Sequence, residues 1–113
     1  MHMTKELTPY GKHTQITDQL RETYLKKNQD YGDSFNESLN EDGLLVAKIR
    51  LMDKMRRFSS LIKSGDILVK DESIEDTLMD MANYAIMTVM WMRCVENPQW
   101  YLDNATKNDG DVE

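Results

Sequence analysis

Four polar residues fall on one helical stripe of the sequence: Glu72, Asp76, Asp80 and Asn83. Each residue advances about 100° around a helix, so intervals of four, four and three hold these side chains within about 80° of arc. Carboxylates gathered at the edge of a core repel one another and lose hydration. They therefore require a divalent cation, a basic partner helix or a retained proton.

Magnesium is the first chemical interpretation of this stripe. Mg²⁺ binds a few carboxylates together with water and phosphate oxygens, which makes Glu72, Asp76 and Asp80 candidate ligands facing a phosphate-bearing molecule. Helix capping is the alternative. If Ser73 is the N-cap, Asp76 completes a capping box, and Glu72 and Glu75 favour the positive helix start. Asp80 lies too far along the helix for capping, so both interpretations stay open.

A basic stripe precedes the acidic one along the chain. Arg50, Lys54 and Arg57 recur at intervals of four and three on a predicted helix. These cations could bind a phosphate group. They could equally pair with Asp76 and Asp80 across the bundle, because buried acids are tolerated only when they are matched. We expect such an ion pair for at least one of the three.

The segment 27–35 is rich in side chains that recognise ligands. Lys27 offers a charge for phosphate, Asp30 offers acceptors, and Tyr31 and Phe35 offer ring faces on which a base could stack. The alternative is an ordinary helix end, in which Gly32 supplies the turn and the aromatic rings fill the core. The pattern alone favours the helix end.

Three long helices must position these residues. The first is predicted over residues 14–31 and ends at the Tyr31-Gly32 pair. The second runs over 43–63, with Asp42 as its N-cap and Gly65 beyond its end. The third runs over 74–95 with Ser73 as its cap. The apolar residues predicted to face the core are Leu44, Ala47, Leu51, Met55, Phe58 and Ile62 in the second helix, and Ile74, Leu78, Ala82, Ala85, Ile86 and Val89 in the third.

The third helix also predicts an oligomer. Its C-terminal half, residues 85–92, has almost no polar face, and a helix that is apolar all round must be covered all round. A neighbouring subunit is the most economical cover in a chain of 113 residues. We expect an extended crossover at 66–70, a short helical segment at 97–102 and a disordered acidic tail at 103–113. The fold class is thus an all-α helical bundle in one domain, 4–102.

Composition excludes several classes of protein. The net charge is −6 and the basic residues are dispersed among acidic ones, which disfavours sequence-independent binding to duplex nucleic acid. The single cysteine, Cys94, excludes a disulfide framework and favours a reducing cytoplasm. No apolar run reaches the roughly 18 residues of a membrane span, and the N-terminus lacks the apolar stretch of a signal peptide. We expect a cytoplasmic protein without a membrane partner.

Two sequence blocks, separated by the basic second helix with Lys48, Lys54 and Arg57, add a family resemblance. The blocks are Lys27-Asn28-x-Asp30-Tyr31-Gly32-Asp33-Ser34-Phe35 and Asp71-Glu72-Ser73-x-Glu75-Asp76-Thr77-Leu78-x-Asp80-x-Ala82-Asn83-Tyr84-Ala85. Over residues 16–92 the chain resembles the nucleotide modification associated domain 1 family, a small helical family found largely in bacteriophages and prophages and associated with genes for modified phage bases. The resemblance implies one shared site, formed by Asp30, Tyr31, Gly32, Glu72, Asp76, Asp80, Asn83 and Tyr84.

The third helix is also similar to the second metal-binding helix of the MazG-type nucleoside triphosphate pyrophosphohydrolases. Those enzymes carry Glu-Glu-x-x-Glu on one helix and Glu-x-x-Asp on the next. This chain has no Glu-x-x-Glu on its first two predicted helices, and its Glu72-x-x-Glu75 pair sits at a helix start. Half of the expected metal site is therefore missing.

Three functions follow from these observations. The first is a phage or prophage nucleotide-binding protein that acts in nucleotide metabolism or sequesters a nucleotide, without metal. The second is a magnesium-dependent pyrophosphohydrolase of the MazG type, in which a metal-bound water attacks a phosphate. The third is a structural helical oligomer with no ligand. The expected partners are a small nucleotide and further copies of the chain.

Overall fold

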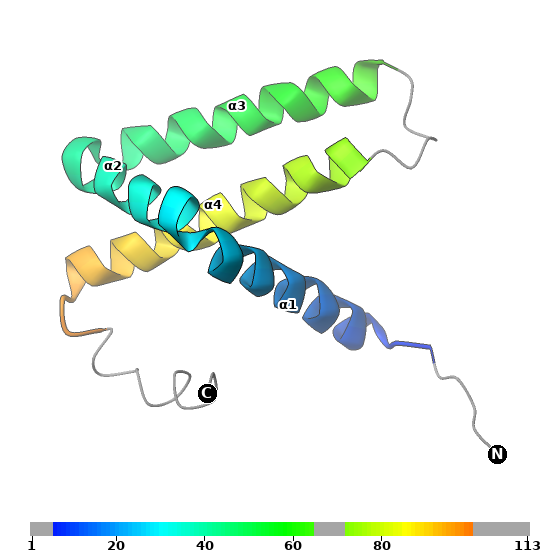
Figure 1. Ribbon diagram of the computed structural model, residues 1–113, viewed down its shortest axis with the longest axis horizontal. Helices are drawn as coiled ribbons and strands as arrows, with labels where there is room; N and C mark the ends of the chain where they lie inside the picture. Colours follow the sequence, from blue (N-terminus) through cyan, green and yellow to red (C-terminus); the bar gives the residue numbers. More distant parts are fainter. Residues whose placement is uncertain (1–5, 65–71, 101–113) are drawn as a thin grey trace.

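The computed structural model describes residues 6–64 and 72–100, and every regular element in them is helical (Figure 1). The chain forms α1 (Pro9–Asn28), a π-helical turn η1 (Gln29–Asp33), α2 (Ser34–Asp42), α3 (Leu44–Lys63) and α4 (Glu72–Glu96). Figure 1 shows α3 and α4 side by side in opposite directions, while α1 crosses α4. The predicted all-α bundle is confirmed.

The first helix begins earlier than residue 14. The side-chain hydroxyl of Thr8 accepts a hydrogen bond from the Gly11 N–H at 3.0 Å, as an N-cap does, and Pro9 takes the first helical position. Proline suits that position because its missing N–H would have no partner there anyway. The helix therefore starts at a capping signal that lies outside the apolar periodicity.

The predicted helix end at Gly32 is wrong. The chain continues through the π-helical turn η1 directly into α2, and Gly32 has no left-handed backbone. This glycine is buried, and a Cβ atom there would lie 2.9 Å from Cε1 of Tyr24 and 2.5 Å from Oδ1 of Asn28. Glycine is needed at this position because neighbouring side chains pack closely against its backbone.

The turn between α2 and α3 depends on Gly43. Its φ of 72° and ψ of −158° lie in a region that is essentially restricted to glycine. The Gly43 N–H donates to the Leu39 carbonyl at 2.8 Å. The predicted N-cap, Asp42, is instead the last residue of α2, because the chain reverses only one residue later. The end of α3 at Lys63 agrees with the prediction.

Substitution of Gly43 tests this turn. Gly43→Ala is expected to lower the free energy of unfolding by about 1–2 kcal/mol. Backbone strain of about 1–3 kcal/mol outweighs the gain of about 0.4–1 kcal/mol from a less flexible unfolded chain. Contact with more distant parts of the protein is not the cause, because no atom outside Gly43 and its two chain neighbours lies within 4 Å of the added Cβ. Urea denaturation measures the change, and a variant as stable as the wild type would contradict the assigned backbone conformation.

The hydrophobic core lies where α2, α3 and α4 meet. Phe35 and Leu39 of α2 pack with Ala47 of α3 and Met87 of α4, and Leu39 is only 1% exposed. On α1, Leu20 is the one buried residue among those described. The core is small, so the orientation of α4 relative to α2 and α3 rests on few large side chains.

The buried face of α4 differs from the predicted one. Thr77, Asn83, Met87 and Thr88 are buried, whereas Leu78, Ala85, Ile86 and Val89 of the predicted inner stripe are exposed. The reason is that three of these four buried side chains are polar, so hydrophobic spacing identified the opposite, more apolar side of the helix. In α3 the prediction fails partly: Ala47 is buried, Leu51 and Phe58 are partly buried, and Leu44, Met55 and Ile62 are exposed.

The chain after α4 begins as predicted. The Asn97 side-chain oxygen accepts a hydrogen bond from the Gln99 N–H at 3.1 Å, which is the geometry of an N-cap. Gly65, the 66–70 crossover and the acidic tail lie outside the described residues. None of the described helices is both long enough and apolar enough to span a membrane.

Candidate functional site

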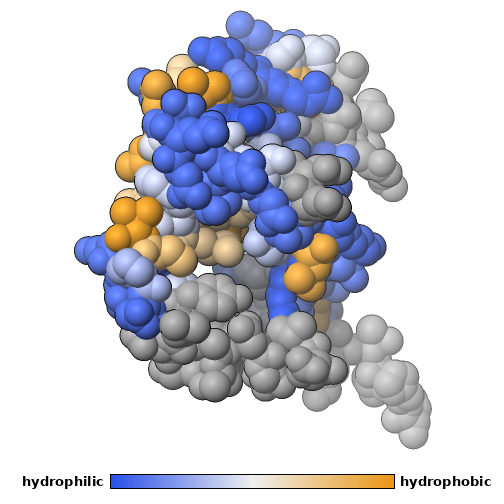
Figure 2. All heavy atoms as spheres, turned by 60° about the vertical axis from the view of Figure 1, so that its left-hand side comes forward, coloured by the Kyte–Doolittle hydropathy of each residue, from blue (hydrophilic) through white to orange (hydrophobic). Residues whose placement is uncertain are grey.

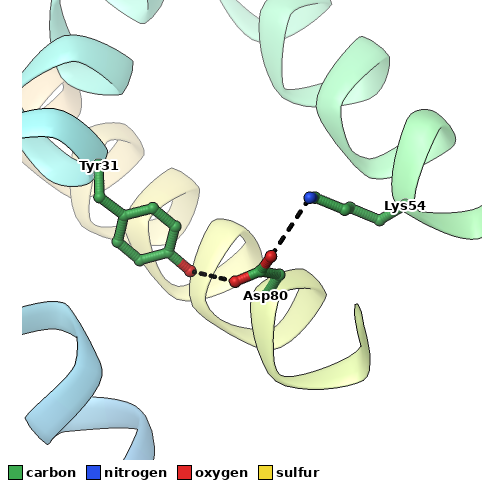
Figure 3. Close-up of polar contacts among 3 residues, drawn as sticks. All are labelled: Tyr31, Lys54 and Asp80. Carbon is green, nitrogen blue, oxygen red and sulfur yellow. Dashed lines mark hydrogen bonds and ion pairs between the residues drawn. The ribbon is translucent and has the colours of Figure 1, made fainter. Parts of the chain in front are cut away.

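Three polar side chains from three elements converge on one point of the bundle (Figure 3). Lys54 of α3 forms an ion pair with Asp80 of α4, with 3.2 Å between Nζ and Oδ2. The Tyr31 hydroxyl of η1 lies 3.5 Å from the other carboxylate oxygen of Asp80, as the donor of a long hydrogen bond. The Lys54 and Asp80 side chains are 29% and 31% exposed, so a ligand can reach both. We call Tyr31, Lys54 and Asp80 the polar triad.

The π-helical turn places Tyr31 in this group. In a π-helix each backbone hydrogen bond spans one residue more than in an α-helix. The turn is therefore wider, and the side chains that follow it point in a different direction. Such turns are rare and occur frequently at functional sites. η1 continues directly from α1 and leads directly into α2, so Tyr31 lies at the junction of two helices.

Two further aromatic rings support the tyrosine. The Tyr31 and Tyr84 rings meet edge to face with centroids 5.3 Å apart, and Phe35 meets Tyr84 in the same manner at 4.9 Å. Phe35 is 3% exposed and lies within the core cluster. Its ring therefore packs against protein in this structure, and Tyr31 is the more accessible of the two predicted stacking residues.

Asn83 lies beside the triad on α4 and joins two helices. Its amide Nδ2 donates to the Leu20 backbone carbonyl of α1 at 3.2 Å, and the residue is 3% exposed. A buried amide needs such a partner, because an unpaired polar group costs about 1–3 kcal/mol in a protein interior. Asn83 thus ties α1 to the helix that carries Asp80.

Electrostatics keep the Tyr31 hydroxyl protonated. Burial raises the pKa of Tyr31 well above its ordinary value, and the negative charge of Asp80 raises it further. A hydrogen bond with Asn83 acts in the opposite direction but does not cancel these effects. Tyr31 therefore acts as a hydrogen-bond donor toward Asp80 or toward a ligand.

Alkaline titration tests this assignment. The ordinary pKa of tyrosine is about 10, so between pH 9 and 11 the tyrosine absorbance of the folded wild type should rise by the same amount as that of Tyr31→Phe. Because the folded-state pKa of Tyr31 is the higher one, its contribution to stability is complete below about pH 10 and is lost as the pH rises further. In denaturant, the two proteins should differ by one tyrosine. A difference of one tyrosine in the folded proteins would contradict the protonated hydroxyl.

The remaining predicted site residues are distributed as follows. Gly32 is buried beside Tyr31 in η1. The exposed ones are Lys27, Arg50, Arg57 and Asp76. The side chains of Asp30 and Glu72 lie outside the part of the molecule that is described. The site's neighbourhood also includes Tyr24, which lies close to Gly32 and which had not been predicted as a site residue.

The contacts of Asp80 show whether the basic residues of α3 pair with the acidic residues of α4. Both of its oxygens have partners in the protein, so the expected ion pair with the basic helix exists at Lys54. Among the side chains that the structure describes, which exclude those of Asp30 and Glu72, no three His, Cys, Asp or Glu residues are grouped as a metal ion requires. A magnesium ion at Asp80 would have to compete with the Lys54 ammonium for the carboxylate. The magnesium interpretation stays a prediction.

Comparison with known proteins identifies the family. Neither a curated protein nor a solved structure matches the chain. The family model described as nucleotide modification associated domain 1 matches residues 27–92, more than half of the 113 residues. The matched region contains the polar triad together with Phe35, Asn83 and Tyr84. The chain therefore belongs to the nucleotide modification associated domain 1 family.

Proposed function

We propose that the protein binds a nucleotide at the polar triad and acts in nucleotide metabolism or modification. The observation that carries this proposal is the convergence of Tyr31, Lys54 and Asp80 from three separate elements, inside the region that matches the family. A phage or prophage gene is the origin that fits, and the host cytoplasm, where nucleotides are abundant, is the compartment. Sequestering a nucleotide would require nothing beyond binding.

The three side chains offer complementary chemistry to such a ligand. The Lys54 ammonium is a compact positive charge suited to a phosphate group, and Arg50 lies one turn before it on α3. The Asp80 carboxylate can accept hydrogen bonds from ribose hydroxyls or from the amino group of a base. The Tyr31 hydroxyl remains a donor over the physiological pH range. A phosphate would compete with Asp80 for Lys54, so binding should weaken the ion pair.

The experiment is a thermal-shift screen with nucleoside mono-, di- and triphosphates, each with and without Mg²⁺. A ligand at about 100 times its Kd stabilises the native state by about 2.7 kcal/mol, which raises Tm by several degrees. We expect at least one nucleotide to raise Tm without metal. The same nucleotide should raise Tm in Arg56→Gln, which removes an exposed ion pair on α3, and should fail to do so in Lys54→Gln, which removes the cation of the polar triad.

Two results would contradict this function. If no nucleotide raises Tm, the helical oligomer without ligand becomes the better account. If only triphosphates with Mg²⁺ raise Tm and pyrophosphate accumulates, the protein is a pyrophosphohydrolase.

A further inference from the structure

An apolar face of α4 lies opposite the packed one. The residues Leu78, Ala82, Ala85, Ile86, Val89 and Met92, here called the outer face, share one side of the helix by their spacing of three and four. Ile86 and Val89 are 45% and 46% exposed. Figure 2 brings the end of the molecule with the C-terminal part of α4 forward and shows orange hydrophobic patches among blue hydrophilic surface.

The chain's own helices pack on the other side of α4. Thr77, Asn83, Met87 and Thr88 are buried there, and α1, α2 and α3 all contact α4. The outer face thus exposes several large apolar side chains on a single helix. Contiguous apolar surface of this kind marks an interaction site more often than isolated exposed residues do.

We propose that a second copy of this chain covers the outer face, by antiparallel packing of α4 against the partner's α4 about a two-fold axis. Between Leu78 and Met92 the outer face contains no charged residue, so nothing in its centre repels an identical surface. Ala82 and Ala85 lie near its middle, and small side chains there allow two helices to approach closely. A two-fold interface requires such a self-complementary surface.

Charge complementarity selects the antiparallel arrangement. Glu75 and Arg93 are both exposed and lie at the same edge of the outer face, because about five turns of 3.6 residues separate them. A two-fold axis near Tyr84 and Ala85 would place Glu75 beside the partner's Arg93, and Arg93 beside the partner's Glu75. Parallel packing about a two-fold axis would place the two copies of each residue at the same level but on opposite edges, so it would form neither of these ion pairs. The Trp100 ring holds the Arg93 guanidinium at this edge, 5.5 Å from its centroid.

Sedimentation velocity at micromolar concentration tests the proposal. We expect the wild-type protein to be a dimer and Val89→Glu to be a monomer with unchanged helical circular dichroism. Leu25→Glu is the matched control, because it places the same charge at an exposed apolar position on α1, and it should remain dimeric. A monomeric wild type, or a Val89→Glu protein that is still dimeric, would overturn the proposal.

A charge exchange tests the antiparallel register, including the case in which Val89→Glu fails to fold. Arg93→Glu should raise the dimer dissociation constant about tenfold or more, because like charges then meet at both ends of the interface. Adding Glu75→Arg should restore most of the affinity. If the double variant associates no better than Arg93→Glu alone, the antiparallel pairing of these two residues is wrong.

Discussion

Replacing Phe35 with alanine is expected to lower the free energy of unfolding by about 3–5 kcal/mol. The ring is 3% exposed and packs against Tyr84, Leu39, Ala47 and Met87 at the meeting point of α2, α3 and α4. Its removal leaves a cavity in a core with few other large side chains. Urea denaturation followed by circular dichroism measures this loss.

Tyr10→Ala is the matched control for this truncation. It also removes an aromatic ring, but from an 81% exposed position on α1, and should change the free energy of unfolding by less than about 0.5 kcal/mol. If Phe35→Ala lost as little as Tyr10→Ala, the ring would not support the core. That result would favour the alternative interpretation, in which the Phe35 ring stacks on a nucleotide base.

Removal of the Asp80 side chain should have the second-largest effect. Exposed ion pairs contribute about 0–1 kcal/mol, whereas breaking a buried pair costs about 3–5 kcal/mol. The pair with Lys54 is partly buried, and Asp80 also accepts from Tyr31. We therefore expect Asp80→Ala to lower the free energy of unfolding by about 1–3 kcal/mol. Chemical denaturation near neutral pH measures it.

A double-mutant cycle separates the pair from other effects of the substitution. Adding Lys54→Met to Asp80→Ala should cost less than Lys54→Met costs alone, because the second change removes an ammonium that has already lost its partner. The pair of Asp53 and Arg56 offers a control at the same 3.2 Å distance, with both side chains mostly exposed. Its coupling energy should be clearly smaller. Equal coupling energies in the two cycles would mean that burial does not strengthen the pair at Asp80.

The sequence predicts those features of the fold that depend on the periodicity of apolar residues and on capping residues. The helical class, the three long helices and the end of α3 at Lys63 follow from the spacing of apolar residues. The continuation through Gly32 could not be predicted, because glycine usually ends a helix and here serves close packing against Tyr24. The packed side of α4 could not be predicted either, since three of its four buried residues are polar and the more apolar side is exposed.

The residues of the candidate site were predicted better than their arrangement. The helical stripe that contains Asp80 and Asn83, and the family resemblance that adds Tyr31 and Tyr84, identified residues that the structure brings together. The choice of Lys54 as the partner of Asp80, instead of a flanking arginine, depends on how α3 is rotated against α4. That rotation is set by packing around Ala47 and Met87, which a single sequence does not specify.

The most direct test of the account is the affinity of Lys54→Gln for the nucleotide that stabilises the wild type most, measured by isothermal titration calorimetry. Arg56→Gln is the control, because it removes one positive charge from an exposed position of the same helix. We predict that Lys54→Gln weakens binding at least tenfold, which corresponds to about 1.4 kcal/mol, while Arg56→Gln changes the affinity less than twofold. Equal affinities of Lys54→Gln and the wild type would contradict nucleotide binding at the polar triad.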